Sequence, residues 1–569
     1  MKRSEFPNPQ WERKNWLCLN GEWEFDFDFG KSAIERKLYE SESLDKRIIV
    51  PFCPESSLSG VGYTDFMPAV VYRKTVVLDK NQLAGRVILH FGAVDFYTVV
   101  YVNGREVCRH KGGYTPFEAD ITDAAVEGEN SVFVYAEDDV RSGKQCGGKQ
   151  STRYESYHCS YTRTTGIWQS VWLEFVPENR ILSAKFYPDI EQGTLTVVGK
   201  TKGTGNVEIN ALYDGAAVGS AVAYSSGSFT ATVKLARIEL WEVGCGRLYD
   251  LELMFDEDAV YSYFGMRSTT LDGMKYRLNG KTVFQRLVLD QGFYPDGIYT
   301  APSDEALIND IKISMGLGFN GARLHEKVFE PRFLYHCDKL GYMVWGEYPN
   351  WGLDHSCAEA LPRYVKEWTE AVERDFNHPS IIGWCPFNET WKYVEQDEKN
   401  ELLSTIYTLT KLLDITRPCI DASGNYHVVT DIYDVHDYEQ NPGKFATYYD
   451  KIADGIINDQ TERRPIWMGK QKYNGEPVFV SEYGGIKWGI NVGKGWGYGD
   501  APKTEAEFMD RYKRLTDILL DNPLLMGFCY TQLYDVEQEQ NGLYTYYREP
   551  KFDDAVIRKI NSRKAAIEG

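Results

Sequence analysis

Hydrophobic and polar positions alternate in short runs between about residues 15 and 178, a pattern that is typical of β-strands. The clearest example is residues 86–110, RVILHFGAVDFYTVVYVNGREVCRH, where the alternation continues on both sides of Asn103-Gly104. Asn-Gly between two such runs is a strong signal for a type I′ β-hairpin. Because many short strands follow one another without a helical period, we expect residues 1–178 to form a jelly-roll β-sandwich.

A second strand-rich segment follows at residues 179–270. Turn signals occur at Asp214-Gly215 and at SSG, residues 225–227. The length of the segment and the even spacing of its turns fit an immunoglobulin-like β-sandwich. In neither of these two segments do ionisable residues gather into a candidate site.

Residues 271–569 show a different pattern, in which strand-like runs alternate with helical ones. SDEALINDIKISMGLG is helical with Ser303 as its N-cap, and PRFLYHCDKLG is a helix that begins with proline and ends with glycine. The eight strand candidates are, in chain order, TVFQRLVLD, GARLH, YMVWGEYP, IIGWCPFNE, CIDAS, YDVHDY, PVFVSEYG and LLMGFCYTQLYD. Their number favours a (β/α)8 barrel, with a doubly wound sheet as the alternative.

Two of these apolar strands lead to a glutamate. IIGWCPFNE ends on Asn388 and Glu389, and PVFVSEYG reaches Glu482 near its end. Catalytic groups of such barrels lie at the C-terminal ends of the strands, so we expect both glutamates at one mouth of the barrel. Glycoside hydrolysis needs two carboxylates there, one that protonates the leaving oxygen and one that attacks the anomeric carbon. Any barrel rim collects some carboxylates, but each of these follows an otherwise apolar run, and the pair indicates a glycosidase.

The composition limits the partners of the chain. Its 83 acidic and 63 basic residues give a formal net charge of -20. A chain this acidic repels phosphate backbones and anionic membranes, so we expect neither nucleic acid nor a membrane as a partner. The N-terminus lacks the apolar core of a signal peptide, and no segment approaches the length of a membrane span, which predicts a cytoplasmic protein.

Cysteine and histidine spacing argues against a disulfide framework or a metal site. The 11 cysteines form no C-x-x-C pair and are expected to be free, mostly buried thiols. The nine histidines show no paired ligand spacing such as H-x-x-x-H. We therefore expect no metal and no cofactor, and hydrolysis by two carboxylates needs none.

The motifs around these strand ends resemble family 2 of the glycoside hydrolases. RDFNHPSIIGWCPFNE is similar to the acid/base motif of that family, in which an Asn-Glu pair closes the fourth strand, and VFVSEYGG is similar to its nucleophile motif on the seventh. Further runs fit the same family in the right order, namely TTGIWQSVWLE, YRLNGKTVFQR, GFNGARLHEK and HCDKLGYMVWGE. The resemblance covers essentially the whole chain and implies the same order of jelly roll, immunoglobulin-like sandwich and barrel.

The resemblance also implies roles for individual residues. Glu389 would be the general acid/base and Glu482 the nucleophile of a retaining mechanism, with their carboxyl groups about 5 to 5.5 Å apart. Glu389 would then need a pKa raised by burial and by the charge of Glu482. Asn388 would donate to the sugar 2-hydroxyl, and Tyr438 or His436 would orient the nucleophile.

Several positions depart from familiar members of the family, and they concern the choice of sugar. Ser160 stands where many members have an aspartate, and Asp290 follows the first barrel strand where many have Arg-His-Glu. After the second strand the usual Arg-x-x-His becomes Arg323-Leu324-His325-Glu326. Because strand alternation lets only one of two neighbours point inward easily, we favour His325 over Glu326. Tyr530 matches an aromatic position that would lie under the sugar.

The sugar itself is predicted from the end of the barrel. The β-glucuronidase branch typically carries Asn-x-Lys after the eighth strand, where this chain has Glu539 and Asn541. An acid there should repel a uronate, which disfavours β-glucuronidase, although Arg163 or Lys327 could meet a galacturonate from elsewhere.

We therefore expect a cytoplasmic, retaining exo-β-glycosidase that acts on a small oligosaccharide or glycoside, and we favour a β-galactosidase. A β-galacturonidase and an α-L-arabinopyranosidase are the alternatives within the family. A carbohydrate-binding protein that has lost catalysis is the alternative from another class, and it would not need both glutamates. The sequence leaves open whether the chain forms a homo-oligomer.

Overall fold

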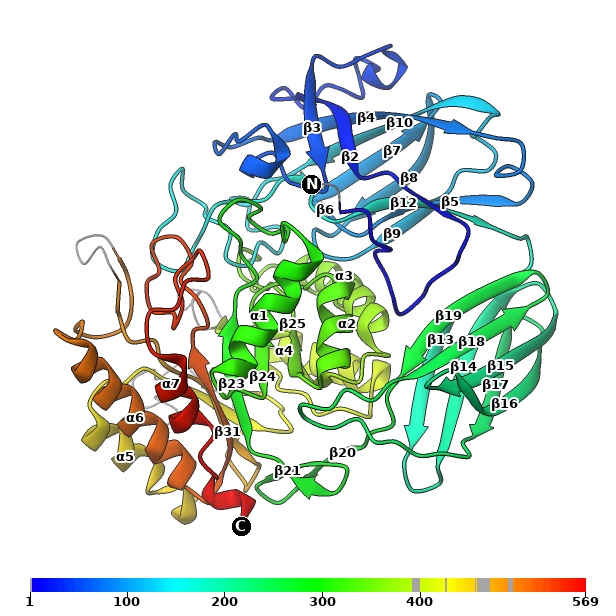
Figure 1. The fold of residues 1–569 in the computed structure, drawn as a ribbon. Coiled ribbons are helices and arrows are strands. Elements are labelled where there is room, and N and C mark those ends of the chain that lie inside the picture. Colours follow the sequence, from blue (N-terminus) through cyan, green and yellow to red (C-terminus); the bar gives the residue numbers. More distant parts are fainter. Residues whose placement is uncertain (1–2, 391–399, 425–426, 456, 458–470, 490–494) are drawn as a thin grey trace.

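Two antiparallel β-sandwiches and a barrel of parallel strands follow one another along the chain (Figure 1). The computed structural model describes residues 3–390, 400–424, 427–455, 457, 471–489 and 495–569. This order of parts confirms the predicted fold class. None of the helices in the described ranges is long and apolar enough to cross a membrane.

The first sandwich packs a four-stranded sheet, in the order β1-β12-β5-β9, against a six-stranded sheet, in the order β3-β2-β4-β10-β7-β8. Its strands are β1 (Trp16–Cys18), β2 (Gly21–Phe27), β3 (Lys46–Val50), β4 (Ala69–Leu78), β5 (Arg86–Phe91), β6 (Val94–Asp95), β7 (Tyr97–Val102), β8 (Arg105–Lys111), β9 (Phe117–Asp120), β10 (Gly128–Glu137), β11 (Gly166–Ile167) and β12 (Val171–Val176). The predicted hairpin joins β7 to β8, and Asn103 and Gly104 both have the positive φ of a type I′ turn, 51° and 79°.

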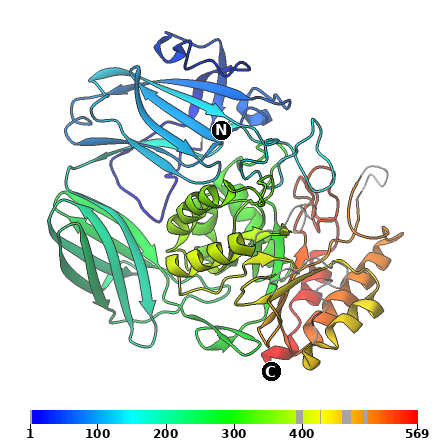
Figure 2. The same ribbon diagram turned by 180° about the vertical axis from the view of Figure 1, so that it is seen from behind.

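The second sandwich packs the sheet β13-β14-β17 against the sheet β16-β15-β18-β19. Its strands are β13 (Arg180–Asp189), β14 (Thr194–Lys202), β15 (Gly205–Tyr213), β16 (Ala216–Ser225), β17 (Ser228–Lys234), β18 (Tyr249–Phe255) and β19 (Asp258–Phe264). Seen from behind, this sandwich lies beside the yellow-green helices of the barrel (Figure 2). Lys185 Nζ donates to the Leu413 carbonyl over 3.2 Å, and Asn377 Oδ1 accepts from the Phe186 amide over 2.9 Å, which ties the two parts together.

The barrel strands form a parallel sheet in the order β26-β25-β24-β23-β31-β30-β29. They are β23 (Gln285–Asp290), β24 (Gly321–Leu324), β25 (Met343–Glu347), β26 (Ile381–Cys385), β29 (Tyr433–Asp437), β30 (Val478–Gly484) and β31 (Leu525–Thr531). The fifth predicted strand is mostly irregular. Cys419 bridges to Trp384, and the short β28 (Ala422–Ser423) pairs with β27 (Phe387–Asn388).

Helices cover the outside of the barrel. They are α1 (Asp304–Gly316), α2 (Pro331–Leu340), α3 (Ala360–Asp375), α4 (Asn400–Leu413), α5 (Pro442–Tyr449), α6 (Glu505–Asp521) and α7 (Asp554–Asn561). The predicted cap of the first helix is confirmed, because the Ser303 side chain accepts a hydrogen bond from the Ala306 amide. The second helix also ends as predicted, at Gly341 in the left-handed conformation.

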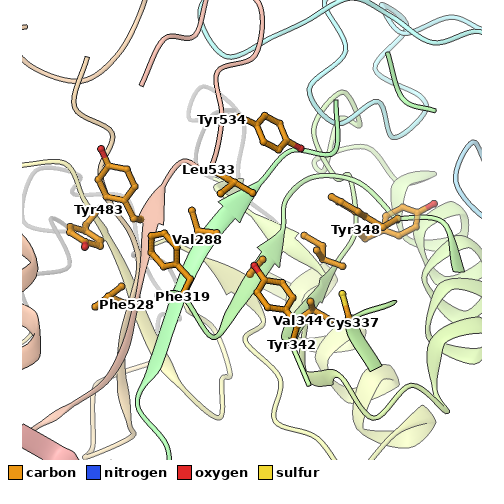
Figure 3. Packing of buried hydrophobic residues seen from close by; sticks show 14 of the residues in the cluster. Val288, Phe319, Cys337, Tyr342, Val344, Tyr348, Tyr483, Phe528, Leu533 and Tyr534 are labelled. Atoms are coloured by element: carbon orange, nitrogen blue, oxygen red, sulfur yellow. The ribbon is translucent and has the colours of Figure 1, made fainter. Parts of the chain in front are cut away.

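Successive residues of each barrel strand face opposite sides. Leu287 and Leu289 of β23 belong to the buried cluster inside the barrel, whereas Val288 between them packs in the layer between strands and helices. Figure 3 shows Val288 in that outer layer together with Phe319 and Tyr342. The interior cluster also includes Tyr276 of the small sheet β20 (Thr269–Asp272), β21 (Lys275–Leu278) and β22 (Lys281–Thr282). The interior is therefore filled with apolar side chains, and a polar site can form only at the ends of the strands.

Two glycines allow the large indoles of neighbouring strands to fit. A Cβ at Gly383 would lie 2.4 Å from the Trp345 ring, and a Cβ at Gly346 would lie 2.6 Å from the Trp384 ring. Trp345 belongs to the interior cluster and Trp384 to the outer layer. In the strand formed by IIGWC, Gly383 thus faces the Trp345 indole, whereas Trp384 faces the opposite side of the strand.

Candidate active site

A cluster of buried and half-buried polar side chains lies at the C-terminal ends of the barrel strands. These ends meet at one mouth because the strands are parallel, so residues far apart in the sequence become neighbours. The members of the cluster are Arg323, His325, Glu347, Asn388, Glu389, His436, Tyr438 and Glu482. All the predicted site residues except Asp290 and Tyr530 are therefore brought together.

Glu389 and Glu482 face each other across His436. One oxygen of each carboxylate and a ring nitrogen of His436 all lie within 4.8 Å of one another. His436 Nδ1 is 2.8 Å from Glu389 Oε1 and 3.4 Å from Glu482 Oε2. Burial alone would lower the pKa of His436, but the charges of Glu482 and Glu389 outweigh it and raise that pKa above the ordinary value. In the described part of the chain this trio is the group with metal-ligand spacing, and its atoms are already paired with one another.

Glu389 and Glu482 differ in exposure and in backbone. The Glu482 side chain is 5% exposed and that of Glu389 is 21% exposed. Glu389 has a φ of 48°, in the left-handed region that side chains other than glycine rarely adopt. Of the two carboxyl groups, that of Glu389 has the greater contact with solvent, where a glycosidic oxygen could reach it.

Two donors hold the Glu482 carboxylate. Arg323 Nη1 donates to Oε1 over 3.0 Å, and the Tyr438 hydroxyl donates to Oε2. Tyr438 is fixed in turn, because its ring stacks on Tyr498 at a centroid distance of 3.4 Å and its hydroxyl lies 3.1 Å from Thr531 Oγ1. A guanidinium and a hydroxyl on opposite oxygens suit an ionised carboxylate with a fixed direction.

Arg323 links four elements of the mouth. Its guanidinium donates to Glu347 Oε1 over 2.6 Å, to the Ser481 carbonyl over 2.8 Å, to Glu482 over 3.0 Å and to Asn388 Oδ1 over 3.3 Å. The residue is 1% exposed. A buried guanidinium that compensates two buried carboxylates keeps their positions relative to each other.

Replacing Arg323 with methionine should lower the free energy of unfolding of the barrel by about 3 to 5 kcal/mol, because it leaves Glu347 and Glu482 buried without a counter-charge. Urea unfolding at neutral pH measures the loss. The double variant Arg323→Met with Glu347→Gln is the control, since it also removes one of the stranded charges and should regain part of the stability. A single variant as stable as the unmodified protein would contradict this role of Arg323.

His325, rather than Glu326, lies against Glu482. His325 Nδ1 is 3.0 Å from Glu347 Oε2, and Nε2 is 3.9 Å from Glu482 Oε1. Burial, and secondly the charge of Lys149, lower the pKa of His325 well below its usual range. Glu326 has a φ of 50° and accepts from the Trp351 amide over 3.2 Å. Strand alternation no longer applies there because β24 ends at Leu324, so both neighbours reach the mouth.

Asn388 is held by its backbone and leaves one side-chain donor unused. Asn350 Oδ1 accepts from the Asn388 amide over 2.7 Å, while Asn350 Nδ2 and Trp351 Nε1 donate to the Asn388 carbonyl over 3.0 and 3.1 Å. Its side-chain Oδ1 accepts from Arg323. Its Nδ2 is buried and has no hydrogen-bond partner in the described part of the chain. A donor positioned in this way is free for a hydroxyl group of a ligand.

The structure corrects the prediction for Tyr530. Its ring packs against Tyr483 and against Tyr512 of α6, outside the barrel, with centroid distances of 5.5 and 4.8 Å. The reason is strand alternation, which turns Tyr530 toward the helices and its neighbour Thr531 toward Tyr438. Tyr530 therefore does not lie under a sugar at this mouth.

Asp290 also lies apart from the two glutamates. Its Oδ1 accepts from the Gly292 amide over 2.9 Å and from the Tyr534 hydroxyl. The pKa of Asp290 is raised to about 6, mainly because the carboxyl group is buried. No hydrogen bond joins it to Glu389 or Glu482 among the described residues, so the structure gives Asp290 a network of its own.

A loop of the first sandwich, residues 143–165, covers one side of the mouth. Tyr161 in this loop donates to Glu539 Oε2, and the Thr162 amide donates to Glu537 Oε1 over 3.0 Å. Ser160 contributes its carbonyl, which accepts from Gln538 Nε2 over 3.1 Å. The loop is therefore joined to the segment that follows β31, and Ser160 supports this contact through its backbone.

Sequence reasoning did not assign Arg323, Glu347, Trp351 or Thr531 to the site. A signal existed for two of them, because Arg323 and Glu347 are charged residues in strands that are otherwise apolar, GARL and MVWGE. Charges within a buried strand need partners nearby. Trp351 and Thr531 offered no comparable signal, since indoles and threonines are common in any core.

Known protein families and individual proteins match the first sandwich and the barrel. Residues 17–174 match the sugar binding domain of glycosyl hydrolases family 2, and residues 301–494 match the TIM barrel domain of that family. A β-glucuronidase of Paenibacillus borealis is 25% identical over 597 residues, covering 96% of this chain and 96% of the relative. A β-galactosidase of Thermoanaerobacter pseudethanolicus is 28% identical over 332 residues, covering 55% of this chain and 44% of the relative. The solved β-glucuronidase from Ruminococcus gnavus, in complex with D-glucuronic acid, has a TM-score of 0.80 at 18% identity, covering 97% of this chain and 98% of that one.

The sequence-based preference for a β-galactosidase over a β-glucuronidase is wrong. The β-glucuronidase relative aligns over nearly the whole chain, whereas the β-galactosidase aligns over about half. The argument from Glu539 fails for a physical reason. That carboxylate is 2% exposed and already accepts hydrogen bonds from Tyr161 and from Asn541 Nδ2, the latter over 2.9 Å. A carboxylate engaged by two donors is a weak source of repulsion for a uronate.

Proposed function

The chain belongs to family 2 of the glycosyl hydrolases, and we propose that it is a retaining exo-β-glucuronidase acting on a small glycoside or oligosaccharide. The observation that carries the reaction type is the approach of Glu389 and Glu482 to within 4.8 Å. Retaining enzymes hold their carboxyl groups about 5 to 5.5 Å apart, and inverting ones about 6.5 to 9.5 Å. The short separation leaves no room for a water molecule between the sugar and the second carboxylate, which favours a covalent route.

The choice of sugar is supported by the relatives. The P. borealis protein named a β-glucuronidase matches this chain from end to end, and the R. gnavus enzyme of similar fold was solved with D-glucuronic acid. The β-galactosidase match covers 55% of this chain and 44% of the relative.

In the first step, Glu482 attacks the anomeric carbon and Glu389 donates its proton to the departing oxygen. Glu482 suits the attack because Arg323 and Tyr438 hold both of its oxygens in one direction. Glu389 suits proton transfer because it is the more exposed of the two and lies toward the opening. The products are a glycosyl ester on Glu482, the released alcohol and an ionised Glu389.

In the second step, Glu389 removes a proton from water, which attacks the anomeric carbon and frees Glu482. Two inversions at that carbon give net retention. His436 lies between the two carboxylates and interacts electrostatically with both. Loss of the Glu482 charge in the ester therefore changes the electrostatic environment of Glu389. Asn388 Nδ2 is placed to donate to the sugar 2-hydroxyl, where hydrogen bonds strengthen in the transition state.

Removal of a terminal residue is supported by the loop 143–165. It joins the segment after β25 through hydrogen bonds from the Gly147 and Gly148 amides to the Trp351 carbonyl, over 2.7 and 3.0 Å. It joins the segment after β31 through Tyr161 and Thr162. A mouth closed on that side favours a pocket for the end of a chain over a groove for its middle.

A panel of 4-nitrophenyl glycosides tests the proposal. We expect kcat/KM for the β-D-glucuronide to exceed that for the β-D-galactoside and β-D-glucoside by about two orders of magnitude, the discrimination that a buried charge contact supports. NMR of the first-formed product should show the β anomer. Faster turnover of a neutral glycoside would contradict the sugar, an α first product would contradict the mechanism, and no turnover of any member would favour a carbohydrate-binding protein.

A further inference from the structure

Three buried basic side chains lie on loops around the barrel mouth: Arg163, Lys327 and Lys149. Two of them are engaged by backbone carbonyls. Lys327 Nζ donates to the carbonyls of Gly292 and Tyr299 over 2.5 and 2.7 Å. The Arg163 guanidinium donates to the carbonyls of Thr64, Ser151, Arg153 and Tyr154. Backbone carbonyls therefore engage Lys327 and both terminal nitrogens of Arg163, and only the buried Nε of Arg163 lacks a partner in the described part of the chain.

Lys149 is different, because its ammonium group makes no hydrogen bond to any residue in the described part of the chain. The residue is 5% exposed, and Nζ lies 3.6 Å from the centroid of the Trp351 ring. Burial by itself would lower the pKa of Lys149, but Cys159 and nearby carboxylates outweigh it and raise that pKa above its usual value. Lys149 is thus a cation at neutral pH on a mostly buried side chain, and no described residue accepts a hydrogen bond from its ammonium group.

The surroundings of Lys149 place it beside the catalytic pair. Trp351, on whose ring it lies, donates through Nε1 to the Asn388 carbonyl, next to Glu389. The charge of Lys149 acts on His325 and Glu389. It also acts on Glu539, in the segment that follows β31.

The backbone at Lys149 is fixed on both sides. The Tyr161 amide donates to the Lys149 carbonyl over 2.7 Å. The next residue, Gln150, donates through Nε2 to Asp95 Oδ2 over 2.8 Å and to the Tyr114 hydroxyl over 3.0 Å. A cation on a rigid backbone is preorganised for a ligand, so less freedom is lost on binding.

We propose that the ammonium group of Lys149 binds the C6 carboxylate of the terminal uronic acid. This inference rests on the proposed function. In this chain the segment after β31 supplies Glu539 and Asn541, and Glu539 accepts hydrogen bonds from both Asn541 Nδ2 and the Tyr161 hydroxyl. Lys149 and Tyr161 belong to the same loop of the first sandwich, and this loop contacts the segment after β31.

The test compares two substrates that differ only at C6, 4-nitrophenyl β-D-glucuronide and 4-nitrophenyl β-D-glucoside. Lys149→Met should lower the ratio of their kcat/KM values by about 100-fold, since the uronate loses a buried counter-charge and the glucoside does not. Lys149→Arg keeps the cation and should retain most of the ratio. Lys327→Met is the matched control, a buried lysine bound to carbonyls, and should leave the ratio unchanged.

The possible outcomes separate the inference from the function on which it rests. If the unmodified protein does not prefer the glucuronide, the proposed function fails and the role of Lys149 fails with it. If it does prefer the glucuronide and Lys149→Met keeps the ratio, only the role of Lys149 is overturned. Circular dichroism reports whether Lys149→Met folds, and Lys149→Gln gives the same comparison with a polar side chain if it does not.

Discussion

Replacing Glu482 with alanine should lower kcat for the preferred glycoside by about 10⁴- to 10⁶-fold, the range seen when a nucleophile is removed from a group of residues that act together. The fold should survive, because the loss leaves Arg323 with Glu347 and the Ser481 carbonyl as acceptors. Steady-state kinetics and a thermal unfolding curve measure the two effects. An alanine variant that keeps its activity would contradict the role of Glu482.

Azide provides a sharper test of the same residue. In the alanine variant a small anion fits the space that the carboxylate leaves, so added azide should restore turnover and give a glycosyl azide of inverted configuration. Glu439→Ala is the matched control. Glu439 lies close to the same mouth and accepts only from the Asn441 amide among the hydrogen bonds described for it, so its loss should change kcat by less than about threefold.

Replacing Glu389 with glycine should lower kcat by about 10²- to 10⁴-fold for a glycoside with a poor leaving group, the usual contribution of a general acid. Glycine is the appropriate substitute because it adopts the φ of 48° at this position without strain. For a 2,4-dinitrophenyl glycoside the leaving group needs no proton, so the first step should remain fast and the ester on Glu482 should accumulate. Burst kinetics would detect that accumulation.

The product formed with azide distinguishes the two glutamates. In the Glu389 variant, azide should attack the ester on Glu482 without needing a base, and the glycosyl azide should have retained configuration. A retained product from the Glu482 variant and an inverted one from the Glu389 variant would show that the two roles are exchanged. An equal loss of kcat for good and poor leaving groups would contradict the assignment of Glu389 as the acid.

Much of the fold was predictable because local pattern and local structure share one period. Alternation around Asn103-Gly104 predicted the hairpin between β7 and β8. Ser303, which is followed by two acidic residues, predicted the start of α1. The fifth barrel strand was the weakest element. Residues 419–423 were predicted as a strand, but only Ala422–Ser423 pairs regularly, because a run this short depends on its neighbours for its conformation.

Two predictions at the site were wrong, one about which way a side chain faces and one about the effect of a charge. Tyr530 and Thr531 are adjacent, and one step of alternation decides which of them faces Tyr438. The predicted effect of Glu539 was also wrong, because its charge was counted without the Tyr161 hydroxyl and the Asn541 amide that bind it. Both errors concern partners that lie outside the local sequence.

The sequence by itself determined the strands, their polar ends and hence the two glutamates, because a period of two or 3.6 and the residue that ends an apolar run are local properties. Only the tertiary structure decided how these ends meet. The closure of the barrel brings Glu389 to Glu482 and puts Arg323 between carboxylates, and the docking of the first sandwich carries Lys149 to Trp351. Contacts between distant segments depend on the geometry of packing, which no local pattern of residues records.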